Sequence, residues 1–285
     1  MTLDDIRRFY SEEIRFAAPL RSRGVAEAFA RVPREEFLGS GPWCIALSNI
    51  GMGATYLTTD DADPRHIYHN VSVALDTSRH LVNGQPATLG RWIDELDIQA
   101  GDSVFHLGCG SGYYTAIMAE MAGPTGHVVA AEVDSDLSNQ ARKNLSHYAN
   151  VTVYKGDGAE LDPGACNAML INAGVTHPLP VWLDRLSERG RMVVPLTVAM
   201  GSSLGKGAVA KITREAGSFA AQVVAFIVIY SCVSARDPQL EPALGKSMGT
   251  GALTKITSVR RDPHAQDDTC IVHSPEVCLS IAPRA

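Results

Sequence analysis

Features that would point to a membrane or a nucleic-acid partner are missing from this sequence. Its 285 residues contain no apolar run of the roughly 18–20 residues that a membrane-spanning helix requires. Acidic residues (31) outnumber lysine and arginine (25), and the formal net charge of −6 disfavours a surface built for phosphates or anionic lipid. The first residues, MTLDDIRRFY, are charged rather than apolar, unlike a secretory signal. The sequence therefore predicts a cytoplasmic protein with no nucleic-acid or membrane partner.

Cysteine pairs of the kind that bind zinc are also missing. Six cysteines are present, but no two have the C-x-x-C spacing. Cys270, His273 and Cys278 are close in sequence, yet a fourth ligand and the usual short pair are absent, so no metal site is predicted. The cysteines are expected to be mostly small buried side chains in a reducing compartment.

The hydrophobic pattern divides the chain into three segments. Residues 1–85 have a helical apolar period up to about residue 38, followed by a stretch over 39–63 rich in Gly, Pro, Thr and Asp. That stretch is predicted to be a long irregular loop, and such loops are often functional. The N-terminal segment and the loop over 39–85 are expected to close over an acceptor. Residues 86–236 and 237–285 form the second and third segments.

The second segment begins with a helix after Pro86 and then alternates short apolar strands with amphipathic helices, the last of these helices over 180–190. This alternation is typical of parallel βαβ units covered on both faces. The predicted fold class is α/β, a Rossmann-like, doubly wound and mostly parallel sheet. An antiparallel pair is expected over 208–230, joined at Gly217-Ser218. The third segment is predicted to be a β-rich extension with one short helix and two strands.

A glycine-rich turn lies at the first strand-to-helix junction of the second segment, in VFHLGCGSGYYT (104–115). Gly108, Gly110 and Gly112 allow the backbone to bend sharply and to approach a ligand closely. The helix that follows offers free N–H groups. The G-x-G-x-G spacing differs from the G-x-G-x-x-G of pyrophosphate binders, which argues against an NAD-dependent dehydrogenase.

Polar residues follow the next three strands as well. Glu132 ends the second strand, where an acid can bind both hydroxyls of a ribose. Asp157, followed by Gly158, ends the third, where it can accept a hydrogen bond from an adenine amine. Asn172 ends the fourth at the same carboxyl edge, where open α/β sheets bind ligands. Together these strand ends predict a site for a nucleoside-type cofactor.

The order of these motifs resembles that of the class I S-adenosylmethionine (SAM) methyltransferases, and within them the protein-L-isoaspartate O-methyltransferase group. The matching stretches are VPREEFL, GSGYYTAIMAEMAGPTGHV, NVTVYKGDG and LPVWLDRLSERGRMVVPL. The resemblance implies that SAM is the cosubstrate and that Gly108, Gly110, Glu132, Asp157 and Gly158 contact it. Further candidates for the cofactor site are Gln85, Cys109, Asn172 and Tyr113, the last through a cation–π contact with the sulfonium.

Two departures from that group are visible. A substrate segment that reads roughly Gly-Gln-Thr-Ile-Ser-x-Pro in the isoaspartyl enzymes corresponds here to VNGQPAT (82–88), without the Ile-Ser element. This difference favours a small-molecule or peptide oxygen or nitrogen acceptor over isoaspartyl repair. The extension after about residue 237 is additional to the group and is interpreted as a lid or a homodimer contact.

The second departure is His106, which stands where methyltransferases usually carry Asp or Glu near the methionine ammonium of SAM. A neutral imidazole can accept a hydrogen bond from that amine, and the alternative is a packed core histidine. On the acceptor side, His69 with His66 could form a general-base pair on a helix face, or simply lie at a surface helix start. Thr176 and His177 follow the fourth strand, where acceptor contacts are expected.

Three functions remain open from the sequence. Methyl transfer from SAM is the leading one, because it depends on positioning and water exclusion and requires no nucleophile triad or metal. In the second, the amine of SAM attacks its own γ-carbon and releases methylthioadenosine, as in azetidine-2-carboxylate synthases, which resemble methyltransferases. The third is a non-catalytic SAM-binding protein.

Overall fold

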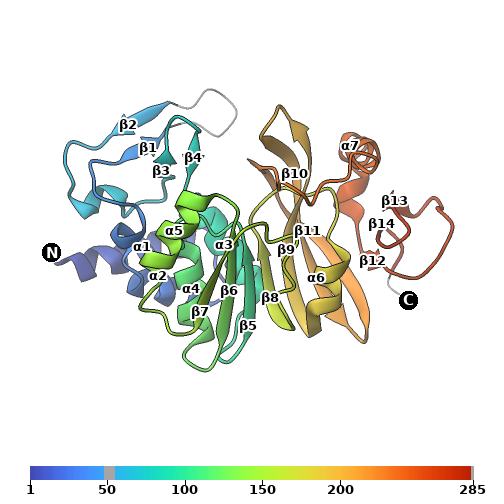
Figure 1. The fold of residues 1–285 in the computed structure, drawn as a ribbon, viewed down its shortest axis with the longest axis horizontal. Helices are drawn as coiled ribbons and strands as arrows, with labels where there is room; N and C mark the ends of the chain where they lie inside the picture. Colours follow the sequence, from blue (N-terminus) through green and yellow to red (C-terminus); the bar gives the residue numbers. More distant parts are fainter. Residues whose placement is uncertain (48–54, 284–285) are drawn as a thin grey trace. The chain divides into compact units, whose positions relative to one another are not determined.

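The fold of the chain is described by a computed structural model that covers residues 1–47 and 55–283. The chain forms two compact units (Figure 1). The first unit comprises Met1–Val104 and Cys109–Gly156, and the second comprises Phe105–Gly108 and Asp157–Ala285. The domain boundaries expected at residues 85 and 236 stay a prediction. No helix of the described residues is long and apolar enough to cross a membrane.

The first unit begins with a helical segment, as predicted. Helix α1 (Leu3–Ala17) starts with a capping box in which Thr2 and Asp5 satisfy each other's backbone N–H groups. Helix α2 (Arg23–Arg31) packs against α1, and a 3₁₀ turn η1 (Arg34–Phe37) follows. The buried faces of these helices supply Ile14, Val25 and Phe29 to the core of this unit.

The stretch expected to be an irregular loop is partly ordered into small elements. Residues 44–46 and 56–58 pair as the antiparallel strands β1 (Cys44–Ala46) and β2 (Tyr56–Thr58). Residues 48–54 of the predicted loop lie outside the described part of the chain. A 3₁₀ turn η2 (Pro64–Ile67) and a short antiparallel pair, β3 (Ala74–Asp76) and β4 (Leu81–Val82), complete this region.

The remainder of the first unit has the expected alternation of helices and strands. Helix α3 (Pro86–Leu96) buries the predicted face of Leu89, Trp92, Ile93 and Leu96. The following elements are α4 (Tyr113–Ala122), β6 (His127–Glu132), α5 (Ser135–Asn144) and β7 (Val151–Lys155). Strands β6 and β7 pair in parallel, and both α4 and α5 pack on β6.

The second unit contains a longer sheet in the order β13-β14-β12-β11-β10-β9-β8-β5. Its parallel part includes β8 (Cys166–Ile171) and β9 (Leu186–Met200), and β5 (Ser103–Leu107) contributes residues 105–107. Strands β10 (Leu204–Glu215) and β11 (Ser218–Tyr230) form the expected long antiparallel hairpin (Figure 1). The hairpin turns at Ala216 and Gly217, whose φ angles of 52° and 78° are those of a type I′ turn.

One helix of this unit is shorter than the sequence predicts. Helix α6 ends at Arg185 (Pro180–Arg185), whereas the prediction extended to residue 190. Strand β9 begins at Leu186, which pairs with Cys166 of β8, and the Glu188 carboxylate accepts the N–H of Ala216 at 2.6 Å. Sheet pairing therefore replaces the helical periodicity that the sequence shows there.

The C-terminal extension is β-rich, as predicted, with one more strand than expected. It contains α7 (Glu241–Gly249), η3 (Ala252–Lys255), β12 (Ser258–Arg260), β13 (Cys270–His273) and β14 (Cys278–Ser280). The strand expected over TCIVHSPEVCLSI is divided by a turn at Ser274–Val277 into the antiparallel pair β13–β14. The parallel pairs β6–β7 and β8–β9 with their helices, and this extension, confirm the predicted α/β class.

Candidate active site

The glycine-rich turn adopts a backbone that side chains disfavour. Gly108, Gly110 and Gly112 all have positive φ angles, of 76°, 56° and 96°. A β-carbon at Gly108 would lie 3.0 Å from the carbonyl oxygen of Asn172, and one at Gly112 would lie 2.8 Å from the side chain of Leu145. A β-carbon at Gly110 would meet nothing closer than 3.8 Å. The first and third glycines are thus required by packing, while the second leaves its backbone open to a ligand.

Glu132 fastens this turn to the end of β6. Its carboxylate accepts the N–H of Gly110 at 2.7 Å and the N–H of Asp134 at 3.0 Å. The residue is only 7% exposed. Burial raises the pKa of Glu132, and the two N–H donors partly oppose that rise. Each carboxylate oxygen keeps a free lone pair, so the residue can still accept hydrogen bonds from a ribose.

Cys109 and Tyr113, beside the glycines, are buried in the first unit. Burial raises the pKa of the Cys109 thiol, with a smaller contribution from Glu132, so the thiol remains protonated and is not a nucleophile. The Tyr113 hydroxyl lies 3.4 Å from that of Tyr10, and its ring lies under the guanidinium of Arg34 at 5.8 Å. Tyr113 therefore packs in an aromatic cluster, and its contact with a sulfonium stays a prediction.

The second unit carries the other predicted cofactor residues. The Asn172 side chain donates to the Gly108 carbonyl at 3.1 Å, which joins the end of β8 to the first glycine. Asp157 is half-buried, and its carboxylate accepts the N–H of Ala159 at 2.9 Å and the hydroxyl of Ser234. Gly158, next to it, is buried. Ser234 has no local sequence signal, because the loop after β11 reaches Asp157 only in the folded chain.

His106 is fully buried in β5. Burial lowers its pKa from 6.5 to about 3, so the imidazole is neutral throughout the physiological range. A neutral ring can accept a hydrogen bond from the amine of SAM, as the first of the two expectations requires, but so complete a burial is also typical of a core side chain. Core packing therefore explains His106 at least as well as a catalytic role, which stays a prediction.

Thr176 and His177 are brought together with the C-terminal extension. The Thr176 hydroxyl lies 3.0 Å from His177 Nδ1 and accepts the N–H of Asp237 at 2.9 Å. The pKa of His177 is lowered because the ring is largely buried, and the charges of Asp237 and Glu276 oppose this shift only in part. Thr176 thus fixes the imidazole of His177 in one orientation.

The two histidines proposed as a base pair are separated by the fold. The η2 turn ends at Ile67, so it includes His66 but not His69, and no helix face is shared. His66 contacts Asp61 at 3.0 Å, whereas His69 lies 3.9 Å from Glu13 and has an exposed side chain. The helix face on which the pair was expected is therefore not formed, and a general-base role of His69 stays a prediction.

Gln85 lies in the segment that differs from the isoaspartyl enzymes. It is an exposed residue at the start of α3, and its amide donates to the Asn70 carbonyl at 3.3 Å. The neighbouring Gly84 accepts a hydrogen bond from the Tyr114 hydroxyl at 3.0 Å. A role in cofactor binding stays a prediction for Gln85.

Arg34 organises the same region, and the sequence reasoning did not single it out. This fully buried arginine donates to the carbonyls of His69 and Val71 at 3.0 and 2.7 Å, and to the side chain of Asn83 at 3.4 Å. Asn83 in turn accepts the N–H of Val73 at 3.1 Å. The signal available in the sequence was the VPREEFL stretch, which contains this arginine ahead of an irregular loop.

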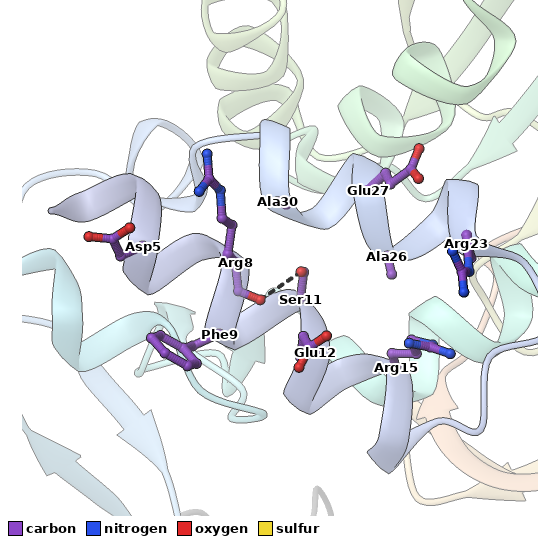
Figure 2. Close-up of a pocket in the computed structure, with 10 residues that line it drawn as sticks. All are labelled: Asp5, Arg8, Phe9, Ser11, Glu12, Arg15, Arg23, Ala26, Glu27 and Ala30. Atoms are coloured by element: carbon purple, nitrogen blue, oxygen red, sulfur yellow. Dashed lines mark hydrogen bonds between the residues drawn. The ribbon is translucent and has the colours of Figure 1, made fainter. Parts of the chain in front are cut away.

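A depression of about 690 Å³ lies on the first unit between α1 and α2 (Figure 2). Its charged lining is balanced between three arginines and three carboxylates, and Ser11 donates to the Arg8 carbonyl within it. Among its described lining residues are none of the predicted site residues. The chemistry expected of the chain therefore lies elsewhere.

Comparison with known proteins decides the family. A sequence model of the protein-L-isoaspartate(D-aspartate) O-methyltransferase family matches residues 12–231. The chain belongs to this family. The match includes the glycine turn, the acids after the strands and the Arg34 stretch, and it ends before the C-terminal extension. SAM is accordingly its cosubstrate, and the chain is a SAM-dependent methyltransferase.

Several relatives and solved structures agree with this assignment. The chain is 30% identical over 185 residues to a protein-L-isoaspartate O-methyltransferase of Ignicoccus hospitalis, covering 62% of this chain and 75% of the relative. It is 31% identical over 190 residues to one of Aeropyrum pernix, covering 65% and 64% of the two chains. A solved protein-L-isoaspartate O-methyltransferase has a TM-score of 0.58 at 18% identity, covering 82% of this chain and 69% of that one.

A Plasmodium falciparum protein described as the same enzyme, solved with S-adenosyl-L-homocysteine, has a TM-score of 0.53 at 15% identity. It covers 79% of this chain and 97% of that one. At these identities the similarity to both structures shows the fold.

The family assignment corrects the function expected from the sequence. The expectation of an acceptor other than an isoaspartyl residue is wrong, because it rested on the VNGQPAT segment alone while the family match extends from residue 12 to 231. The alternatives of a SAM-cleaving cyclase and a non-catalytic SAM-binding protein find no support in the family or its relatives. The replaced Ile-Ser element is a local substitution in a segment that Arg34 and Tyr114 still hold in place.

Proposed function

We propose that the protein transfers a methyl group from SAM to the free α-carboxylate of isoaspartyl residues in peptides or proteins. The observation that carries this proposal is the family match over residues 12–231. In an isoaspartyl residue the main chain runs through the side-chain carbonyl, so the α-carboxylate is free. Methylation converts this carboxylate into an ester. The next backbone nitrogen could then attack the ester carbonyl and close a ring with release of methanol, which would begin repair.

The chain's side chains fit a reaction that needs positioning rather than a base. Bound SAM supplies a methyl group activated by its positively charged sulfur. A carboxylate acceptor is already ionised near neutral pH, with an ordinary pKa of about 4, and needs no proton removed. The neutral, buried His106 and the exposed His69 are compatible with such a mechanism. Catalysis would then come from orientation and the exclusion of water.

Acidic residues at or just after the ends of strands β6 and β7 are proposed to bind the cosubstrate. Glu132 would accept the ribose hydroxyls beside the open backbone of Gly110. Asp157 would accept the adenine amine. Both hydrogen bonds are charge-assisted, and Glu132, which would accept two hydroxyls, is expected to contribute most to affinity.

His177 is proposed to contact the acceptor. If Thr176 donates its hydroxyl hydrogen to Nδ1, the proton of the neutral imidazole is on Nε2. That Nε2–H could donate a hydrogen bond to one oxygen of a carboxylate while the other oxygen attacks the methyl group. The lowered pKa of His177 keeps the ring neutral, so it orients the acceptor without forming a tight ion pair that would weaken the nucleophile.

The test uses two synthetic peptides of the same sequence, one with an isoaspartyl residue and one with an aspartyl residue. Each is incubated with the full chain and SAM, and fragmentation mass spectrometry locates any added methyl group. The proposal expects one methyl group on the isoaspartyl α-carboxylate and none on the aspartyl peptide. Equal methylation of both peptides, or of neither while S-adenosylhomocysteine still binds, would contradict it.

A further inference from the structure

The C-terminal extension brings together four side chains that the methyltransferase family does not account for. They are His264, Cys270, His273 and Cys278, and one ligand atom of each lies within 4.8 Å of the others. All four follow residue 231, where the family match ends. The sequence suggested three of them but offered no fourth ligand. The fold supplies it as His264, from the loop between β12 and β13.

A β-bulge places three of the four on one face of the β13–β14 hairpin. Residues three apart in a regular strand point to opposite faces, so Cys270 and His273 would normally diverge. The pairing instead shifts between positions 270 and 272, with Cys270 opposite Ser280 and His273 opposite Cys278. Because Cys278 and Ser280 are two apart on β14, the extra residue turns Cys270 and His273 toward the same side. Such a bulge is a specific device for directing side chains.

The spacing of the ligand atoms fits a tetrahedral metal ion. A tetrahedron with Zn–S bonds of about 2.3 Å and Zn–N bonds of about 2.0 Å has S···N edges of about 3.5 Å. Cys270 Sγ lies 3.6 Å from His264 Nε2. The His264 and His273 rings meet edge to face, with centroids 4.7 Å apart and planes at 70°. Two thiolates and two imidazoles form a ligand set that zinc prefers.

Neighbouring groups orient these ligands as they do at known metal sites. His264 Nδ1 lies 2.7 Å from the Asp262 carbonyl oxygen, so its proton is on Nδ1 and the lone pair of Nε2 faces Cys270. The backbone N–H of Asp267 donates to Cys270 Sγ at 3.4 Å, which stabilises a thiolate. Among the described residues, no group hydrogen-bonds the buried Nδ1 of His273. A buried nitrogen in that state costs free energy unless it gains a partner.

The charges of the cluster suit a divalent cation. A bound Zn²⁺ favours the deprotonated form of a coordinating thiol, and with two thiolates and two neutral imidazoles the site is neutral. The nearby Arg260 already pairs with Asp262 at 2.7 Å and with Asp267 at 3.6 Å, which reduces its repulsion of a metal.

We propose that His264, Cys270, His273 and Cys278 form a structural Zn²⁺ site that holds the C-terminal hairpin together. Four protein ligands leave no open coordination position, so the site is structural and not catalytic. The strands it joins are only three or four residues long, so few ladder hydrogen bonds hold them and a metal would stabilise them.

The test measures the metal content of the full chain, expressed with added zinc and purified without chelators or a histidine tag. Wild type is expected to carry about one zinc per chain by elemental analysis. The double variant with Cys270→Ser and Cys278→Ser should lose most or all of the zinc. The single variant His264→Gln should lose most of it as well. Cys44→Ser, which changes a cysteine in the other unit, should retain it.

A second measurement keeps the proposal testable if the variants fold poorly. Cobalt added to metal-depleted wild type should give the visible bands of a tetrahedral site with thiolate charge transfer, and binding should release protons from the two thiols. Unchanged zinc content in the double variant would overturn the proposal. So would a Cys270–Cys278 disulfide in protein purified under reducing conditions, or octahedral cobalt spectra without thiolate bands.

Discussion

Replacing Glu132 by glutamine should weaken cosubstrate binding and also lower the stability of the fold by a similar free energy. The change removes the charge and one of two acceptor oxygens, so the N–H of Gly110 or Asp134 faces an amide NH₂ that cannot accept. Hydrogen bonds to a charged group are worth about 1.5–3 kcal/mol, so loss of the ribose contact corresponds to a dissociation constant raised roughly 10- to 150-fold. The unsatisfied N–H should lower the free energy of unfolding by about 1–3 kcal/mol.

The assay is calorimetric titration of the folded variant with S-adenosylhomocysteine, accompanied by chemical denaturation. Glu27→Gln is the matched control, because it removes the same charge from an exposed side chain on α2 that pairs with Arg31 at 4.0 Å. That control should bind as wild type does. If folded Glu132→Gln binds within twofold of wild type, the assignment of Glu132 to the cosubstrate is refuted.

Three further changes probe the rest of the account. The pKa of buried His106 is about 3 in the folded chain and 6.5 in the unfolded chain. The free energy of unfolding should therefore fall as the pH drops below 6.5, by up to about 1.4 kcal/mol per pH unit. His106→Asn should abolish that slope in denaturation curves, and exposed His127→Asn should not. Arg34→Leu should lower the free energy of unfolding by at least about 3 kcal/mol, since several buried carbonyls lose their donor, and Arg34→Lys should lower it less. His177→Ala should raise KM for an isoaspartyl peptide about tenfold and leave S-adenosylhomocysteine affinity unchanged, which steady-state kinetics and calorimetry can separate.

The sequence predicted those parts of the fold that depend on local periodicity and turn chemistry. The helix after Pro86, the strand-to-helix turn at Gly108 and the hairpin near Gly217 each have a local signal, and each is present. The end of α6 was missed because residues after Arg185 are drawn into the sheet by pairing with β8. Long-range pairing of this kind leaves no mark on the local pattern.

The site was less accessible to sequence reasoning than the fold. The glycine turn and the acids at the strand ends follow one another in a characteristic order along the chain, and this order identifies the acids as candidates. The role of Arg34 depends on carbonyl groups more than thirty residues away, and the fourth metal-ligating side chain, His264, depends on a loop and a bulge. The cytoplasmic location and the homodimer stay predictions.

The acceptor was predicted wrongly because of the VNGQPAT segment. One short segment, VNGQPAT, was given more weight than the scaffold that holds it. Arg34 binds the side chain of Asn83 in that segment, and Tyr114 binds the carbonyl of Gly84, so neither contact depends on the residues that replace the Ile-Ser element. The identity of two residues there was therefore weak support for a different acceptor.

The most direct test of the central claim is the ratio of kcat/KM for the isoaspartyl peptide to that for its aspartyl isomer. The free carboxylate is the α-carboxylate in the isoaspartyl peptide and the side-chain carboxylate in the aspartyl peptide, so its position differs between the isomers. A displacement of about 1 Å at the reacting atoms can lower the rate about 10²-fold. Isoaspartyl methyl transfer predicts a ratio of at least about 100, with one S-adenosylhomocysteine formed for each methyl ester made, including esters that have already closed to the ring with loss of methanol. A ratio near one, or S-adenosylmethionine consumed with neither peptide ester nor methanol formed, would contradict this activity.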